Sequence, residues 1–562
     1  MREPTSTPRI WAPNAKHVEI VVGGQRIAAT ADLDGWWRAP PLGEGDDYQV
    51  SVDGGAPRPD PRSRWQPSGV HGPSRWIDLD PERVGFEPPS LADAVIYELH
   101  AGTFTRERTF AAVCDHLDHL VELGVTHVEL MPIAQFPGRH GWGYDGVGLF
   151  APHAAYGGPS GLRALVRALH ARGLAVLIDV VHNHFGPEGA YGPELAPYET
   201  DRHRTPWGKA INLDGEHARE VRRFMIDSAL TWLRDYGADG LRLDALHSLR
   251  DESDRHFVAE LVDEVHGLGR QLQRRFVLIG EYDDHDPMAV TERSSGGWGL
   301  DAHWNDDLHH AVHALLTRET QRYYADFAEP GTLAKILERG YALDGGYSSF
   351  RGEHHGKPFG DVWRDRLVAY VQSHDQVGNR AWGERLHHLC GIDRAKLAAA
   401  ILMCAPFVPM VFQGEEWAAS TPFLYFADLE DPELREACRK GRREEHGIAR
   451  GPDPFAVETL EASTLHWDER HDGEHASMLA WYRTLISARH RYHELRDPRP
   501  EATRAITLDG GGLAIERGDL ALLCNFSGEA MRVEAGDVLL ASTGGTSHRE
   551  LPPVSCALVR RA

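Results

Sequence analysis

Three carboxylates, Asp244, Glu281 and Asp375, each end a short and mostly apolar run of the chain. Each run predicts a buried strand. The runs are residues 240–244, 276–281 and 370–375. In a barrel of parallel strands the carboxyl ends of all strands meet on one face, and that face carries the chemistry. Three acids brought to such a face from distant parts of the chain indicate cleavage or transfer of a glycosidic bond.

Two of these acids differ in their neighbours, which predicts different protonation. Arg242 lies two residues before Asp244, and side chains two apart on a strand point to the same side. We therefore expect Arg242 to lower the pKa of Asp244 and keep it ionised, as a nucleophile needs. Glu281 follows five uncharged residues, 276–280, so we expect burial to raise its pKa, as a general acid needs. Taken singly, each feature is equally well explained by a structural ion pair or an ordinary strand-end acid.

The elements that must position these acids alternate between strand and helix from about residue 92. Amphipathic helices are predicted between the strands, for example at 109–124 and 217–236. Eight strands are predicted, at 94–100, 128–132, 175–181, 240–244, 276–281, 302–304 (a weak signal), 370–375 and 408–413. This order predicts an α/β fold with a (β/α)8 TIM barrel. The alternative, a doubly wound sheet, usually has a glycine-rich phosphate loop after its first strand, and residues 97–103 do not form one.

Smaller units are expected on both sides of the barrel. Residues 1–88 predict an N-terminal β-sandwich, and residues 496–562 predict a small C-terminal β domain. The catalytic barrel is then residues 89–495. Residues 57–73 are rich in proline and predict an extended connector between the first two units.

Composition excludes several classes of partner. The chain has 562 residues and a formal net charge of −24, which disfavours nucleic acid and anionic membranes. No secretory signal and no run of about 18 apolar residues is present, so we expect no membrane span. The six cysteines are scattered without a CxxC pair, which is typical of reduced thiols in a cytoplasmic protein.

Four segments at strand ends, in this order, resemble the four signature regions of the α-amylase family of glycoside hydrolases. The segments are residues 179–184 (DVVHNH), 242–244 (RLD), Glu281 and residues 373–376 (SHDQ). The resemblance implies a barrel, an α-glucan substrate and a retaining double displacement, with no cofactor. The N-terminal unit likewise resembles the carbohydrate-binding-like (E-set) domains of branching enzymes.

The roles of the family's residues carry over by position. Asp244 matches the nucleophile, Glu281 the general acid/base and Asp375 the third acid, which binds sugar hydroxyls. Further matches are the arginine that orients the nucleophile, two sugar-binding histidines, an aromatic platform and a supporting acid. These are Arg242, His184, His374, Tyr144 and Asp179.

Asn183 matches a position that is a calcium ligand in many amylases. A hard cation wants about six or more oxygen ligands, and residues 185–216 show no dense acidic cluster. We therefore expect an ordinary hydrogen-bonding asparagine and no metal, with calcium as the alternative.

Other segments narrow the resemblance to one group within the family, the maltooligosyltrehalose trehalohydrolases. The segments are residues 57–74, 97–104, 412–423 and 441–445. The resemblance implies hydrolysis of the α-1,4 bond next to the terminal trehalose of maltooligosyl trehalose, in a pathway with maltooligosyltrehalose synthase. Two alternatives are a 1,4-α-glucan branching enzyme, which has the same domain order and acids, and a non-catalytic glucan-binding protein, which would lack one acid.

Two positions depart from the wider family. Gly280 replaces the usual alanine before the acid, and His247 replaces the usual lysine three residues after the nucleophile. His247 is expected on the leaving-group side, or alternatively on the surface at a helix start. Candidates to line a pocket for trehalose are Trp142, Glu415, Glu416 and Trp417, for which an aromatic side chain packing the rim, or a solvated acid, is an equally good explanation.

Overall fold

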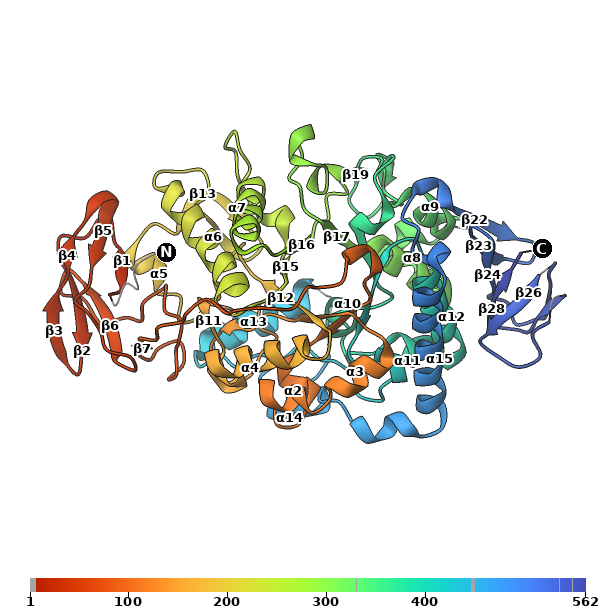
Figure 1. Cartoon of the computed structure of the whole chain (residues 1–562), viewed down its shortest axis with the longest axis horizontal. Coiled ribbons are helices and arrows are strands. Elements are labelled where there is room, and N and C mark those ends of the chain that lie inside the picture. The colour runs from red at the N-terminus through yellow and green to blue at the C-terminus, as the bar shows by residue number, and fades with distance from the viewer. Residues whose placement is uncertain (1–6, 330, 446–449, 535, 548, 562) are drawn as a thin grey trace.

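A closed barrel of eight parallel strands forms the centre of the computed structural model (Figure 1). The structure describes residues 7–329, 331–445, 450–534, 536–547 and 549–561. In order around the barrel, the strands are β8 (Ile96–Leu99), β9 (His127–Leu130), β12 (Ala175–Val180), β15 (Gly240–Leu243), β16 (Val277–Gly280), β17 (Ala302–Asn305), β20 (Leu367–Ala369) and β21 (Val408–Phe412). β21 pairs with β8 and closes the barrel. The predicted fold class is confirmed.

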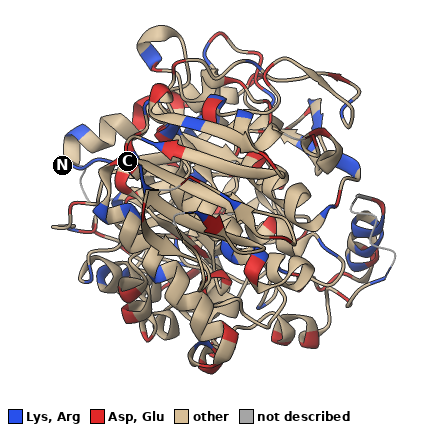
Figure 2. Ribbon diagram, turned by 90° about the vertical axis from the view of Figure 1, so that its right-hand side faces the viewer, with Lys and Arg blue, Asp and Glu red and all other residues tan. Residues whose placement is uncertain are grey.

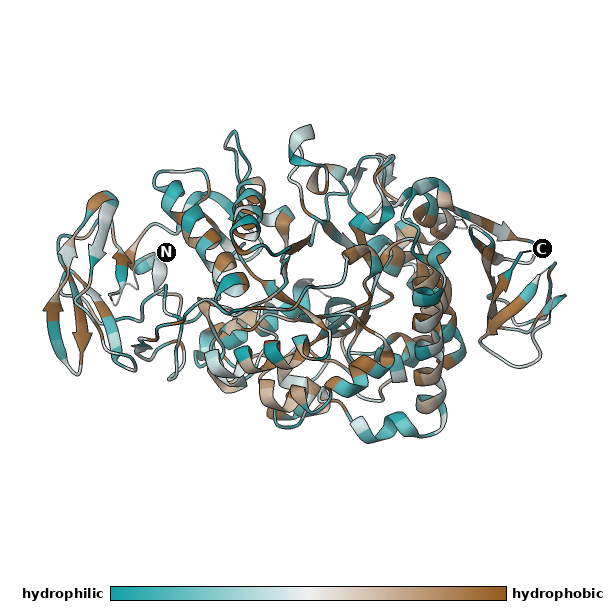
Figure 3. Ribbon diagram, viewed as in Figure 1, coloured by the Kyte–Doolittle hydropathy of each residue, from teal (hydrophilic) through white to brown (hydrophobic). Residues whose placement is uncertain are grey.

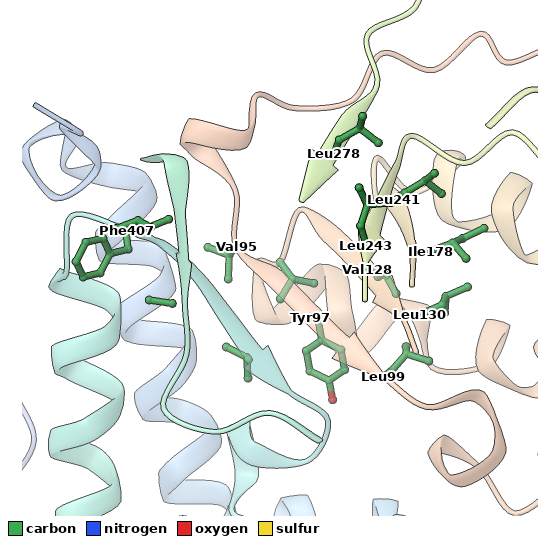
Figure 4. Close-up of a cluster of buried hydrophobic side chains, with 14 of the residues drawn as sticks. Val95, Tyr97, Leu99, Val128, Leu130, Ile178, Leu241, Leu243, Leu278 and Phe407 are labelled. Atoms are coloured by element: carbon green, nitrogen blue, oxygen red, sulfur yellow. The ribbon is translucent and has the colours of Figure 1, made fainter. Parts of the chain in front are cut away.

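Helices cover the outside of the barrel. The main ones are α4 (Gly158–His170), α6 (Ala218–Arg234), α7 (Phe257–Leu272), α8 (Asp306–Thr317), α9 (Thr332–Arg339), α12 (Ile392–Cys404) and α15 (Gly473–Arg491). A further helix, α13 (Pro432–Glu445), has no buried residue among positions 432–444. Every residue of β8, β9, β12 and β15 is buried, as expected for parallel strands covered on both faces. Hydrophobic residues therefore concentrate in the central strands (Figure 3). Leu99, Leu130 and Ile178 belong to the cluster that packs there (Figure 4).

The seventh strand differs from its prediction. The prediction of a strand at 370–375 is wrong, because β20 ends at Ala369 and Asp375 lies in the short helix α10 (His374–Gly378). Ser373 begins this helix with a capping box, in which its own backbone N–H donates to the Gln376 side chain at 2.9 Å. The Ser-x-x-Gln spacing is a helix-start signal, and it displaces Asp375 from the strand to the first turn of a helix.

Antiparallel sheets flank the barrel at both ends of the chain (Figure 1). The N-terminal sheets consist of β1 (Arg9–Trp11), β5 (Trp36–Arg38) and β4 (Thr30–Ala31), and of β3 (Gln25–Ala28), β2 (Val18–Val22), β6 (Asp47–Val52) and β7 (Ser74–Arg75). The five-stranded C-terminal sheet consists of β22 (Thr503–Leu508), β23 (Gly512–Arg517), β24 (Leu520–Asn525), β28 (Ser555–Arg560) and β26 (Asp537–Ala541). The domain boundaries at 88/89 and 495/496 stay predictions.

Acidic and basic positions are mixed along the helices and loops of the view toward the C-terminal sheet (Figure 2). Among the described residues, no helix combines the length and the apolar character needed to cross a bilayer.

Buried Arg489 joins the end of α12 to the start of β21 and to the segment before the C-terminal sheet. It is 2% exposed, and its guanidinium donates to four backbone carbonyls. These belong to Met403, Ala405, Phe407 and Leu495, at 2.6–3.0 Å.

We expect Arg489→Met to lower the free energy of unfolding by about 3–5 kcal/mol, since each buried carbonyl left without a donor costs about 1–3 kcal/mol. Denaturant melts measure the change, and exposed Arg491→Met is the matched control. A loss in Arg489→Met no larger than in the control contradicts this account.

Candidate active site

Three acids from neighbouring strands meet on one arginine. Arg242 on β15 is fully buried, and its Nη1 lies 2.8 Å from both Asp244 Oδ1 and Asp179 Oδ2. Its Nη2 lies 2.8 Å from Glu281 Oε2. Register explains the meeting, because Arg242 is opposite Asp179 on β12 and opposite Ile279, two residues before Glu281, on β16. The structure thus brings Asp244 and Glu281 together on the two nitrogens of a single planar group.

Asp375 and His374 join this cluster through Tyr144. The Tyr144 hydroxyl lies 2.7 Å from Asp179 Oδ2 and 2.8 Å from His374 Nε2. His374 Nε2 lies 3.6 Å from Asp375 Oδ1. Burial opposes a charge on His374, but Asp375 and Glu98 outweigh it and raise its pKa to about 9. His374 is therefore a cation at neutral pH that links the third acid to the cluster.

Three residues that sequence reasoning did not single out hold the cluster in place. Glu98 on β8 is buried, and its Oε1 lies 2.5 Å from His374 Nδ1. Ala245 has a left-handed backbone (φ 42°), and its N–H donates to Glu281 Oε2 at 2.8 Å. Trp304 stacks under Arg242, with the guanidinium carbon 4.1 Å from the ring centroid. The only sequence signal was Glu98, a charge inside an otherwise apolar strand.

Asn183 uses its side chain on Asp244. Its Nδ2 donates to the Asp244 carbonyl at 2.9 Å and to Asp244 Oδ2 at 2.7 Å. The amide therefore orients the carboxylate, and Asn183 is the hydrogen-bonding asparagine that the sequence predicts.

His184 contacts Tyr144, and His247 lies near Glu281. His184 Nε2 lies 3.0 Å from the Tyr144 carbonyl, and burial lowers the pKa of His184 to about 4. Its ring stacks on the half-exposed Trp207, with centroids 4.9 Å apart. His247 is partly buried in a 3-10 turn, Leu246–Ser248, and lowers the pKa of nearby Glu281.

The protonation predicted for the two central acids is wrong in both directions. Burial raises the pKa of Asp244 well above its usual value, and Arg242 does not outweigh burial together with the repulsion from Glu281 and Asp179. Burial also acts to raise the pKa of Glu281, but Arg242, His247 and the Ala245 N–H lower it below its usual value. The difference lies in the neighbours: His247 and the Ala245 N–H act with Arg242 on Glu281, whereas Glu281 and Asp179 repel a charge on Asp244.

The charges around Arg242 explain why the cluster retains a proton. Asp179, Asp244 and Glu281 share one guanidinium, and burial raises the pKa of Asp179 to about 6. Three carboxylates cannot all ionise around one buried cation without a large cost. Their protons therefore belong to the cluster as a whole.

The predicted trehalose pocket of Glu415, Glu416 and Trp417 is wrong. All three lie in the buried turn η9 (Glu415–Trp417). Trp417 is fully buried and donates from Nε1 to Glu469 at 3.2 Å. Glu415 accepts from the Tyr482 hydroxyl, and Glu416 accepts from that of Tyr97. Burial raises the pKa of Glu415 to about 8, so it is mostly uncharged at neutral pH. These side chains pack the inside of the protein and cannot reach a sugar.

Trp142 is also buried, against the expectation that it lines the trehalose pocket. It is 5% exposed, and its Nε1 donates to the Leu424 carbonyl at 2.9 Å. Its ring stacks on Phe423 and meets His374 edge-on, with the latter centroids 5.4 Å apart. Trp142 therefore supports His374 by packing.

Comparisons with known proteins agree with this geometry. Residues 102–205 match the α-amylase catalytic domain family. A malto-oligosyltrehalose trehalohydrolase from Arthrobacter ramosus is 48% identical, over 85% of this chain and 86% of that protein. One from Mycobacterium tuberculosis (strain ATCC 25618 / H37Rv) is 42% identical over 99% of both chains. A 1,4-alpha-glucan branching enzyme from Kitasatospora aureofaciens is 30% identical, over 73% of this chain and 56% of that protein.

Solved structures share the whole architecture. A crystal structure from Salmonella typhimurium, assigned as a candidate α-amylase, has a TM-score of 0.92 and 36% identity, and covers 99% of this chain and 97% of that one. A pullulanase from Anoxybacillus sp. LM18-11, complexed with maltotetraose, has a TM-score of 0.73 and 18% identity, over 100% of this chain and 87% of that one. The second likeness shows the fold alone.

Proposed function

This chain belongs to the malto-oligosyltrehalose trehalohydrolases, glycoside hydrolases with an α-amylase catalytic domain, and we propose that it cleaves its substrate by a retaining double displacement. The bond is the α-1,4 linkage next to the terminal trehalose of maltooligosyl trehalose, and the products are trehalose and a shortened maltooligosaccharide. The observation that supports the mechanism is the Arg242 guanidinium, which lies 2.8 Å from both Asp244 and Glu281.

In the first step Asp244 attacks the anomeric carbon while Glu281 gives its proton to the departing glycosidic oxygen. The glycosyl group is then bonded to Asp244, and trehalose leaves. In the second step Glu281 takes a proton from water, which attacks the same carbon and frees Asp244. A retaining enzyme needs its two carboxyl groups about 5–5.5 Å apart. That Asp244 and Glu281 each lie 2.8 Å from the Arg242 guanidinium supports a short separation.

The other site residues hold the sugar. Asp375 is the candidate to bind the hydroxyls of the reacting glucose, because its side chain is 36% exposed, against 9% for Asp244 and 20% for Glu281. The cationic His374 beside it is the second candidate. Tyr144 and His184 are the candidates to border the same glucose, and His247 to face the trehalose side.

Without substrate, the proton that Asp244 and Glu281 share is not on the acid that the first step requires. The pKa directions put the shared proton on the Asp244 side, whereas the first step needs it on Glu281. Both forms carry the same net charge, so a change in pH does not convert one into the other. We propose that the substrate selects the productive form, in which Arg242 and Asn183 stabilise ionised Asp244.

We expect kcat/KM to follow a bell-shaped pH profile. At low pH Glu281, whose pKa is lowered, also takes up a proton. Asp244 and Glu281 are then both protonated, and no ionised nucleophile remains. At high pH the last proton is lost from the Asp244 side, whose pKa is raised, and no acid remains. Because His247 lowers the pKa of Glu281, His247→Gln should move the acid limb to higher pH and leave the basic limb in place. An unmoved acid limb contradicts this assignment.

Product analysis tests the function itself. Incubation with maltooligosyl trehalose should release free trehalose, detected by chromatography. New α-1,6 branches in amylose, without trehalose release, would instead identify a branching enzyme; one such enzyme is 30% identical to this chain.

We also propose a pathway partner and a cellular location for this protein. The substrate carries trehalose at the end of a glucan, so a maltooligosyltrehalose synthase must supply it. All six cysteines are free thiols, which supports a reducing, cytoplasmic setting.

A further inference from the structure

Three atoms of two loops beside the active site form a triangle outside the catalytic cluster. His285 Nδ1 lies 2.9 Å from the carbonyl oxygen of Asp283 and 3.0 Å from His355 Nε2. His355 Nε2 lies 2.8 Å from the same carbonyl oxygen. Asp283 and His285 follow β16 shortly after Glu281, whereas His355 follows β19 (Glu353–His354).

Hydrogen bonds satisfy this triangle only if both rings donate to the Asp283 carbonyl, which leaves the two ring nitrogens 3.0 Å apart with no bond between them. The carbonyl oxygen has no hydrogen, and each ring nitrogen carries at most one. At most two hydrogens are therefore available for three close pairs, so at least one pair stays in contact without a hydrogen between its atoms. A single cation at the centre would satisfy all three atoms at once.

The dimensions of the triangle fit a metal ion. Ligands at about 2.1 Å from an ion, and at right angles to each other, lie about 3 Å apart. A carboxylate oxygen of Asp283 is also close, because it and one nitrogen from each histidine all lie within 4.8 Å of one another. Arg351 donates to both oxygens of this carboxylate at 2.6 Å, so the carboxylate balances charge and leaves the inner positions to the two nitrogens and the carbonyl.

The surroundings of His285 have the usual form of a metal-binding histidine. Its Nε2 lies 2.8 Å from Oδ1 of the fully buried Asp307. A ligating histidine almost always donates its other N–H to such a carboxylate, which fixes the ring and its tautomer. His285 also has a left-handed backbone, with φ 49°, an uncommon conformation that often marks a functional position.

We propose that His285, His355 and Asp283 form a binding site for a divalent transition metal that takes octahedral coordination, such as Co2+ or Ni2+. The sequence predicted no bound metal, so this proposal departs from that prediction. The ion would fasten the loop after β16 to the β18–β19 hairpin (β18, Tyr347–Ser348), where the Lys357 N–H already donates to the His285 carbonyl at 2.9 Å. Its role is to hold the loop that carries Glu281, and it takes no part in the chemistry of bond cleavage.

Cobalt(II) titration of the full-length, tag-free protein tests the site without substrate, so the result is independent of the proposed function. We expect one equivalent of Co2+ to give a visible absorption band and to raise the melting temperature. His355→Ala and His355→Gln should weaken this binding by at least about 10-fold. Asp307→Asn should weaken it by about 10–100-fold, since it removes the carboxylate partner of His285.

The matched control is His354→Ala, which removes an exposed histidine on the same hairpin whose Nδ1 faces the Gly345 carbonyl. This variant should bind Co2+ like the parent protein. Equal binding by the His355 variants and the parent, or no binding by the parent, overturns the proposal. The two His355 variants keep the test valid if one of them fails to fold.

Discussion

Asp244→Asn is expected to lower the rate of trehalose release by a factor of at least about 10⁴, because the nucleophile is part of a unit whose members are all needed. The amide has the size of the carboxylate, but its neutral oxygen cannot form the glycosyl–enzyme bond. Its single oxygen can accept from either Arg242 or Asn183, which now donate to the two carboxylate oxygens at 2.8 and 2.7 Å. The loss of rate should appear in kcat, and the melting temperature reports what the lost hydrogen bond costs in stability.

The control for this variant is Asp254→Asn, at an exposed acid on the loop that follows the same strand. It should keep full activity. Melting temperatures of both variants separate a chemical loss from a folding loss. If Asp244→Asn folds and keeps more than a small percentage of the parent rate, Asp244 is not the nucleophile.

Glu281→Gln is expected to slow cleavage of maltooligosyl trehalose by about 10²–10⁴, the usual contribution of a general acid. A glycosyl fluoride should suffer much less in its first step, because fluoride leaves without a proton. The second step still needs a base, so the glycosyl–enzyme should accumulate. Burst kinetics of fluoride release measure the first step, and steady-state turnover measures the second.

The amide oxygen that Glu281→Gln introduces would still accept from the Ala245 N–H, which now donates to Glu281 at 2.8 Å, so the fold should persist. An equal loss for both substrates would mean that Glu281 acts only by holding Arg242. Asp284→Asn, at an exposed acid on the same loop, is the control and should leave both rates unchanged.

The barrel and its acids were predictable because the signals are local. β12 and β15 are short apolar runs between amphipathic helices, and parallel strands place the residues that follow them on one face. Asp244 and Glu281 directly follow such strands, so their meeting follows from the fold. Asp375 was predicted beside the other acids, but at the end of a strand. It lies instead in the first turn of a helix, because the capping signal at Ser373 overrides the strand pattern.

The protonation of the acids was not predictable, because it depends on contacts across the chain. Asp179, which repels Asp244, contacts Arg242 from 63 residues away in the sequence. Glu98, which keeps His374 charged, is separated from it by 276 residues. Sequence neighbours alone suggested that Arg242 would act only on Asp244, whereas the structure shares it among three acids.

The inward orientation of the turn at Glu415–Trp417 was also not predictable from the sequence. Left-handed residues enter and leave it, Gly414 with φ 78° and Ala418 with φ 52°. They turn the side chains inward, toward Tyr482 and Glu469. These partners lie 67 and 52 residues further along the chain, so the local sequence of acids and tryptophan gave no sign of burial.

Mass spectrometry of the trapped intermediate tests the central claim most directly. Glu281→Gln is incubated with a maltooligosyl fluoride, quenched, digested and mapped. The mechanism predicts a single glycosyl adduct, on the carboxylate of Asp244 in the peptide that contains residues 242–244. An adduct on Asp179, Asp375 or any other residue, or rapid turnover through an intermediate that never becomes covalent, would contradict it.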